Sequence, residues 1–237
     1  MIAGQSNASG RGTSAQLWAN TTLIPKSFNN AYTITVLVDP SDSSAGQVDA
    51  VSIDVAAAGS VWPLVADDIM NNEGVVPLFV PCAMGGTSIT DWLPGADHED
   101  RTTLYGSMVY RAKQAWTYGA QKCVLWHLGE SDALAGMTRA TYNGHLDTLA
   151  NAVVADLGVP LVAAKIHKWD EAPAPTQAAV DEINDGIDDA WGDNVNVLQG
   201  PDFDNPARVT DLLHFTTDAE LLDAAGRWWV QIEALFY

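Results

Sequence analysis

The sequence has few basic residues and no long apolar run. Eleven Lys and Arg stand against 30 Asp and Glu, which gives a formal net charge of −19 over 237 residues. This charge repels phosphate backbones and anionic lipid surfaces, so neither nucleic acid nor a membrane is an expected partner. No stretch approaches the roughly 18 uninterrupted apolar residues of a transmembrane helix. The acidic excess favours a salt-adapted or highly soluble surface.

Cysteine and metal-binding motifs are also scarce. Cys82 and Cys123 each border an apolar run typical of a core strand, so we expect two buried free thiols. The sequence contains no His-Glu-x-x-His and no paired Cys-x-x-Cys, and the acidic stretch 39–49 lacks the pattern of a calcium loop. No metal is therefore expected. The given chain shows no signal-peptide pattern, and its composition suggests an extracellular or virion-associated protein.

After an irregular first quarter, strand-like apolar runs alternate with helical patterns. The expected strands are residues 32–38, 48–56, 75–81, 122–127, 160–166 and 195–198, and the expected helices are 60–71, 106–118, 142–157, 176–191 and 217–235. This order predicts a three-layer α/β/α fold with a parallel sheet of about five strands. Residues 32–38 and 48–56 are expected to form a small β-hairpin insertion. No repeat or linker interrupts the pattern, so we expect a single domain over residues 1–237.

The first residues carry the strongest chemical signal. Residues 1–3 end an apolar strand that runs directly into Gly4-Gln5-Ser6-Asn7. A sharp strand-to-helix turn can present a serine hydroxyl as a nucleophile, provided that a histidine and an orienting acid are available. The segment from Asp211 to His214 supplies both. Taken alone, either motif could be an ordinary turn or a chance spacing.

Two further polar blocks follow expected strands. Gly85-Gly86-Thr87-Ser88 and Gly129-Glu130-Ser131-Asp132 come after the runs 75–81 and 122–127. Ligands bind at the carboxyl ends of strands in α/β sheets, so these loops should lie beside the serine. The order of the blocks resembles the SGNH hydrolase superfamily, most closely its sialate O-acetylesterase and acetylxylan-esterase-like branch. The resemblance covers nearly the whole chain and implies a flavodoxin-like α/β fold.

The resemblance implies a role for each matching residue. Ser6 is the nucleophile, His214 the general base and then general acid, and Asp211 the residue that orients the imidazole. The backbone N–H groups of Ser6 and Gly86 form the oxyanion hole, and no cofactor is needed. The sequence departs from the family at Leu128, where relatives usually carry a glutamine whose amide is a further donor.

Other residues of these blocks are candidates for substrate binding, namely Gln5, Thr87, Trp92, Glu130 and Asp132. Trp92 suits a sugar-stacking platform and a lid over the core equally well. The two acids could orient sugar hydroxyls, although acids after a strand are more often solvated or cap a helix.

The sequence therefore predicts a serine esterase that removes O-acetyl or other small acyl groups from an acetylated carbohydrate. A neighbouring carboxylate should raise the pKa of His214 above about 6.5. The main alternative is a glycan-binding or structural module of a viral or cell-surface fibre, in which the change at Leu128 has weakened the hydrolase site. A lipase is a third option. The oligomeric state is not indicated.

Overall fold

The computed structural model describes residues 1–204, 209–210 and 212–237. At its centre is a parallel sheet of strand order β1-β5-β6-β7. The strands are β1 (Ile2–Gly4), β5 (Val124–His127), β6 (Leu161–Lys165) and β7 (Val197–Asp202). On the outer side of β1, Ile2 forms a parallel bridge with Pro81. The chain after residue 79 thus continues the sheet, which matches the expected parallel α/β architecture.

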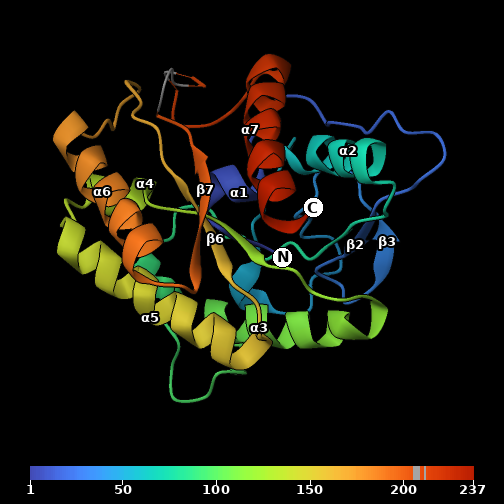
Figure 1. Cartoon of the computed structure of the whole chain (residues 1–237), viewed down its shortest axis with the longest axis horizontal. Helices are drawn as coiled ribbons and strands as arrows, with labels where there is room; N and C mark the ends of the chain where they lie inside the picture. Colours follow the sequence, from blue (N-terminus) through green and yellow to red (C-terminus); the bar gives the residue numbers. More distant parts are fainter. Residues whose placement is uncertain (205–208, 211) are drawn as a thin grey trace.

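Helices cover both faces of this sheet (Figure 1). One face packs against α3 (Leu104–Ala115), α5 (Arg139–Leu157) and α6 (Gln177–Asp193). The other packs against α2 (Trp62–Glu73) and α7 (Asp218–Phe236). The three-layer arrangement predicted from the alternation of patterns is confirmed.

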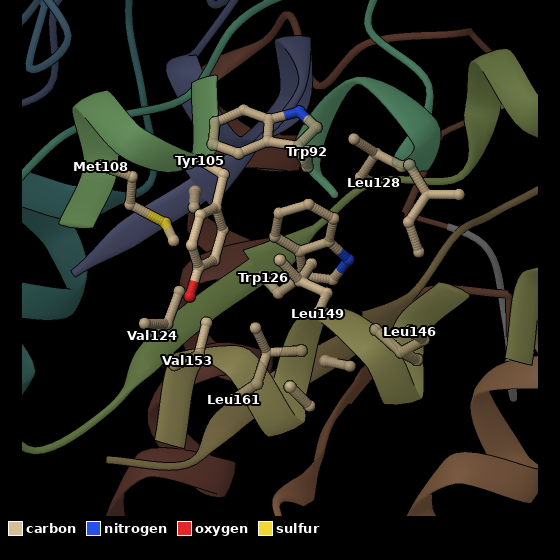
Figure 2. Packing of buried hydrophobic residues seen from close by; sticks show 14 of the residues in the cluster. Trp92, Tyr105, Met108, Val124, Trp126, Leu128, Leu146, Leu149, Val153 and Leu161 are labelled. Atoms are coloured by element: carbon tan, nitrogen blue, oxygen red, sulfur yellow. The ribbon is translucent and has the colours of Figure 1, made fainter. Parts of the chain in front are cut away.

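Successive strand residues serve the two faces in turn. In β5, Val124 and Trp126 belong to the core under α3 and α5, whereas Leu125 belongs to the core under α2 and α7. Because both faces are buried, the strands consist of continuous apolar residues. Figure 2 shows the first of these cores, in which Trp92 and Trp126 meet edge to face with ring centroids 5.4 Å apart.

Short helices connect the main elements. They are α1 (Ser6–Ser9), α4 (Glu130–Leu134) and the 3-10 helices η1 (Ala50–Ser52), η2 (Ile89–Trp92) and η3 (Trp116–Tyr118). Helix α1 follows β1 directly and α4 follows β5, so both begin at the carboxyl edge of the sheet.

The predicted helix ends are largely reproduced. Thr217 and Glu220 form the expected capping box of α7, and Gly158 ends α5 in the left-handed conformation. Helix α5 begins earlier than predicted, because the side chain of Thr138 accepts a hydrogen bond from Thr141 N and caps the first turn.

The predicted hairpin is wrong in its second strand. Strand β3 (Ile34–Val36) pairs antiparallel with β2 (Lys26–Phe28), which pairs on its other side with β4 (Leu78–Phe79). Residues 48–56 instead form η1 and irregular chain. The carboxylate of Asp49 accepts hydrogen bonds from Tyr32, Arg101 and Ser107. These bonds anchor residue 49 to the turn before β3, to the segment before α3 and to α3 itself, rather than in a strand.

Cys82 and Cys123 are buried free thiols, as expected. None of the described helices combines the length and apolar character needed to cross a membrane.

Candidate functional site

Ser6 is placed by β1 and the turn that follows it. It is the first residue of α1, and its carbonyl accepts a hydrogen bond from Gly10 N at 2.9 Å. The preceding amide of Gln5 donates to His127 O at 3.0 Å. At Gly4, φ is +123° and an added Cβ would lie 2.1 Å from His127 O. Only glycine permits so close an approach to β5, and this approach fixes the serine at the edge of the sheet.

The imidazole of His214 faces this serine. Nε2 of His214 lies 2.9 Å from Ser6 Oγ, although the two residues are 208 positions apart in the sequence. This is the separation of a nucleophile and its general base. The structure therefore brings together two of the predicted catalytic residues. Asp211, the third, lies outside the described residues.

The surroundings of His214 keep its imidazole neutral. Burial, followed by the positive charges of Arg11 and then His167, lowers the pKa of His214 to about 4, although Glu171 and Asp54 act in the opposite direction. The expectation of a pKa above about 6.5 is thus wrong, because loss of hydration of the imidazolium outweighs the nearby carboxylates. At neutral pH the ring is ready to accept a proton.

The two predicted oxyanion donors are available for a ligand. Within the described part of the chain, no group accepts a hydrogen bond from the backbone N–H of Ser6 or Gly86. Gly86 is exposed and has a φ of +77°, a conformation that favours glycine. The preceding amide of Gly85 is occupied, because it donates to Asp54 Oδ2 at 3.0 Å.

Asp54 ties the serine block to the glycine loop. Its carboxylate accepts hydrogen bonds from Ser9 Oγ at 2.7 Å and from Arg11 Nη2 at 2.8 Å, in addition to that from Gly85. Sequence reasoning missed both Asp54 and Arg11. Asp54 lies in a segment that the sequence predicts as a strand of the hairpin, and no local motif distinguishes it from the other 29 acidic residues.

Leu128 does not point into the site. Its side chain is fully buried in the core shown in Figure 2, and its carbonyl accepts a hydrogen bond from Tyr142 Oη at 2.6 Å. The glutamine amide of the family thus has no counterpart at this position. The adjacent His127 is also a core residue, since it is buried and stacks on Phe203 with ring centroids 4.8 Å apart.

Trp92 and Thr87 stabilise the glycine loop, residues 85–88, by hydrogen bonds on its buried side. Trp92 is fully buried, and its Nε1 donates to Thr87 Oγ1 at 3.0 Å. The hydroxyl of Thr87 in turn donates to Met84 O at 2.8 Å. The assignment of Trp92 as a stacking platform is wrong, because a fully buried indole offers no face to a sugar. It is a lid over the core.

Asp132 is buried as well. Its carboxylate accepts hydrogen bonds from Ser88 Oγ and from Ile89 N, which fixes the start of η2 below the glycine loop. An acid used in this way does not orient substrate hydroxyls, so this candidate is also corrected.

Gln5 and Glu130 are buried next to the Gly-Gln-Ser-Asn turn. Gln5 is 3% exposed, and its Oε1 accepts a weak hydrogen bond from Ser131 N at 3.4 Å. Glu130 is 1% exposed and accepts a hydrogen bond from Asn7 Nδ2 at 2.7 Å. Their burial places them in the support of the site, and Glu130 in particular does not face a substrate.

One cavity lies away from these residues. It has a volume of about 380 Å³ and is lined at the opposite end of β1 and β5 by residues that include Met1, Val80 and Cys123. Neither Ser6 nor His214 lines it. Among the described residues, no group of three His, Cys, Asp or Glu side chains could hold a metal ion.

Comparison with known proteins identifies a family for this chain. Residues 1–225 match the family model described as carbohydrate esterase, sialic acid-specific acetylesterase. A probable carbohydrate esterase from Arabidopsis thaliana is 30% identical over 173 residues. That alignment covers 68% of this chain and 64% of the relative, so it spans less than two thirds of the relative's length.

Solved structures share the fold over a longer span. The Arabidopsis protein superimposes with a TM-score of 0.73 at 22% identity, over 99% of this chain and 97% of its own. NanS gives a TM-score of 0.66 at 17% identity, over 98% and 95%. A carbohydrate acetylesterase from Xanthomonas citri gives 0.62 at 14% identity, over 98% of this chain and 55% of its own. The chain therefore belongs to the carbohydrate esterase family of sialic acid-specific acetylesterases.

Proposed function

We propose that this chain is a serine esterase that removes O-acetyl groups from carbohydrate hydroxyls through an acetyl-enzyme. The contact of 2.9 Å between His214 Nε2 and Ser6 Oγ carries the proposal, because it joins a nucleophile to a base at the carboxyl edge of the sheet. The family supports an esterase acting on carbohydrates. The Xanthomonas citri protein of the same fold is described as a carbohydrate acetylesterase.

In the first half of the reaction, Ser6 Oγ bonds to the acetyl carbonyl carbon while its proton passes to His214 Nε2. The carbonyl oxygen becomes an oxyanion, and the amides of Ser6 and Gly86 donate hydrogen bonds to it. When the tetrahedral intermediate collapses, the bond to the sugar oxygen breaks. His214 returns the proton to that oxygen, and the deacetylated sugar leaves.

In the second half, a water molecule gives a proton to His214 and attacks the acetyl-enzyme. The second tetrahedral intermediate collapses when its bond to Ser6 Oγ breaks, and His214 returns the proton to that oxygen. Acetic acid leaves and ionises to acetate, and the hydroxyl of Ser6 is restored. Only side chains, backbone amides and water take part. In this scheme the low pKa of His214 favours the neutral base but weakens it as a proton acceptor, so orientation on Ser6 is essential.

The test is hydrolysis of an activated acetyl ester and of acetylated sugars by the wild type and by Ser6→Ala. Ser6→Ala should fold normally and lose activity by at least about 10³-fold, because nucleophile and base act as one unit. Ser14→Ala, at an exposed serine, is the matched control. A serine-directed sulfonyl fluoride should add its mass to the wild type and the control but not to Ser6→Ala.

Retention of more than about a tenth of the activity by Ser6→Ala would contradict the proposal. If the wild type itself binds acetylated glycans without hydrolysing them, the alternative of a glycan-binding module is favoured. The buried side chain of Leu128 makes that comparison worthwhile, because it leaves the site without the family's amide donor.

A further inference from the structure

The loop that carries His214 has no regular secondary structure between residue 212 and the start of α7. No ladder of backbone hydrogen bonds therefore fixes the base. Instead, buried side chains from distant parts of the chain bind the backbone of this loop at successive positions. These contacts are independent of the predicted acid of the triad.

Asn7 holds the loop on both sides of the base. Its Nδ2 donates to Leu213 O at 3.1 Å, and its Oδ1 accepts from Phe215 N at 3.3 Å. One amide thus contacts the residue before His214 and the residue after it. Asn7 is 4% exposed and directly follows Ser6. Asn7 therefore fixes the position of His214 relative to the turn that carries Ser6.

Glu130 fixes the orientation of Asn7. Its Oε1 accepts a hydrogen bond of 2.7 Å from the same Nδ2. An amide oxygen cannot donate, so this bond specifies which end of the Asn7 side chain faces Leu213 and which faces Phe215. Glu130 is the first residue of α4, which follows β5.

His167 adds a third point of support. It is fully buried after β6, and its Nε2 donates to Leu212 O at 2.8 Å. Its ring also stacks on Phe215 with centroids 5.2 Å apart. The backbone of residues 212–215 is thus held from β1, β5 and β6, three neighbouring strands of the sheet.

We infer that Asn7, oriented by Glu130 and assisted by His167, is a positioning residue that holds His214 on Ser6. This inference rests on the proposed function and adds residues to it. Asn7 and Glu130 contact no reacting atom and act only through the loop backbone.

The main test compares Asn7→Ala with Asn30→Ala. Asn30 is a matched control, because its buried Nδ2 also donates to a carboxylate, Asp42 Oδ1 at 2.7 Å, and to a backbone carbonyl, Ser43 O at 2.8 Å. Both variants lose a buried Nδ2 that donates to a carboxylate and to a backbone carbonyl. Among the described residues, Asn7 Oδ1 also accepts from Phe215 N, whereas Asn30 Oδ1 has no partner, so only the loss of Asn7 releases the loop on both sides of the base. Asn7→Ala should lower kcat about 100-fold with KM little changed, the scale expected for a displacement of about 1 Å. Asn30→Ala should keep kcat within about threefold of the wild type.

The pH profile provides a readout that lost stability alone does not move. With the loop released, His214 becomes more hydrated, and the step in kcat/KM should move upward from about pH 4 in Asn7→Ala. In Asn30→Ala the step should stay where it is in the wild type.

A second variant covers the case in which Asn7→Ala does not fold. Glu130→Met removes the acceptor of Asn7 together with the buried carboxylate, so the fold should survive while kcat falls about tenfold. Glu130→Gln keeps an oxygen acceptor for Asn7 Nδ2 and should recover most of that loss.

Two results would overturn the inference. One is that Asn7→Ala and Asn30→Ala have equal kcat and the same pH step. The other is that Glu130→Met and Glu130→Gln are equally active. If Ser6→Ala abolishes turnover while either result is found, the proposed esterase stands and only the role of Asn7 and Glu130 is lost. Activity that survives in Ser6→Ala contradicts the proposed function itself.

Discussion

Ser6 and His214 lie within hydrogen-bond distance, yet they are held in different ways. The serine follows a strand that pairs with β5 and bridges residue 81, and backbone hydrogen bonds fix the turn around it. The histidine lies on an irregular loop held by side chains from other elements. The turn at Ser6 is thus held mainly by main-chain hydrogen bonds, and the backbone next to His214 mainly by side chains.

The difference indicates where the site tolerates substitution. Around Ser6 the requirement is for a small residue and a strand register, which few substitutions satisfy. Around His214 the requirement is for particular donors and acceptors, so single side chains can be exchanged and their effects measured. The following predictions test this contrast.

The largest effect is expected where the two halves meet. His214→Ala should reduce turnover of an acetyl ester by at least about 10³-fold, and the double variant with Ser6→Ala should be no slower than either single variant. Steady-state assays on the three purified proteins measure this. If the fold-reduction in turnover of the double variant equals the product of the two single reductions, the two side chains act separately.

Gly4→Ala should break the serine side by steric overlap. The added Cβ would meet His127 O at 2.1 Å and φ is +123°, so the free energy of unfolding should fall by more than about 4 kcal/mol. Gly74→Ala is the control, because φ is +67° there but no atom lies within 4 Å of the new Cβ. It should cost about 1 kcal/mol. Urea unfolding of both variants measures the difference, and equal losses would contradict the close approach of β1 to β5.

On the histidine side, Glu130 makes stability depend on pH. Burial raises its pKa from 4.5 to about 7, so the folded protein holds this proton more tightly than the unfolded chain does. The neutral carboxyl group of Glu130 makes its full contribution to the free energy of unfolding below pH 4.5. This contribution is lost as the pH rises to about 7. Glu130→Gln should therefore gain about 3 kcal/mol over the wild type between pH 4.5 and pH 8. Urea unfolding at several pH values tests this, with the exposed Glu233→Gln as control; a constant difference between Glu130→Gln and the wild type would refute it.

Leu128→Gln tests whether the missing amide can be restored. Because Leu128 is fully buried, the new amide should lie unpaired in the core, cost about 1 to 3 kcal/mol and leave turnover no faster. Leu134→Gln, at a residue 41% exposed, should leave stability unchanged. A rise in turnover of about tenfold in Leu128→Gln would mean instead that this side chain reaches the oxyanion hole.

The smallest effect concerns the protonation of the base. With the pKa of His214 lowered to about 4, kcat/KM should be flat from pH 6 to 8 and fall about tenfold for each unit below pH 4. A profile in a buffer of constant ionic strength measures the midpoint. A midpoint at or above about 6.5 would show that a carboxylate, rather than burial, dominates the pKa of His214.

The sequence was sufficient to predict the main sheet, the five long helices and the approach of Ser6 to His214. These features depend on local signals, such as continuous apolar runs, the capping box at Thr217 and the Gly-Gln-Ser-Asn turn. They also depend on the rule that loops after parallel strands meet at one edge. The triad acid remains a prediction, because residue 211 is not described.

The errors arose where tertiary contacts decide the outcome. Residues 48–56 have strand-like composition, but the hydrogen bonds of Asp49 anchor the chain elsewhere. Trp92 follows the glycine loop as a sugar platform would, yet it packs on Trp126. A neighbouring carboxylate in the sequence predicts a raised pKa for His214, whereas burial dominates that pKa in the structure and lowers it. The local sequence around these residues does not predict how deeply their side chains are buried.

The position of β1 inside the sheet has a consequence for how the protein folds. Residues 2–4 pair with residues 125–127 and lie beside residue 81, and Ser6 meets a histidine 208 positions away. Contacts of such large sequence separation form late, because long loops must close first. During synthesis, more than 120 further residues must be added after β1 before its partner β5 is complete. Covalent labelling of Ser6 during refolding should therefore follow the last steps of assembly rather than early collapse.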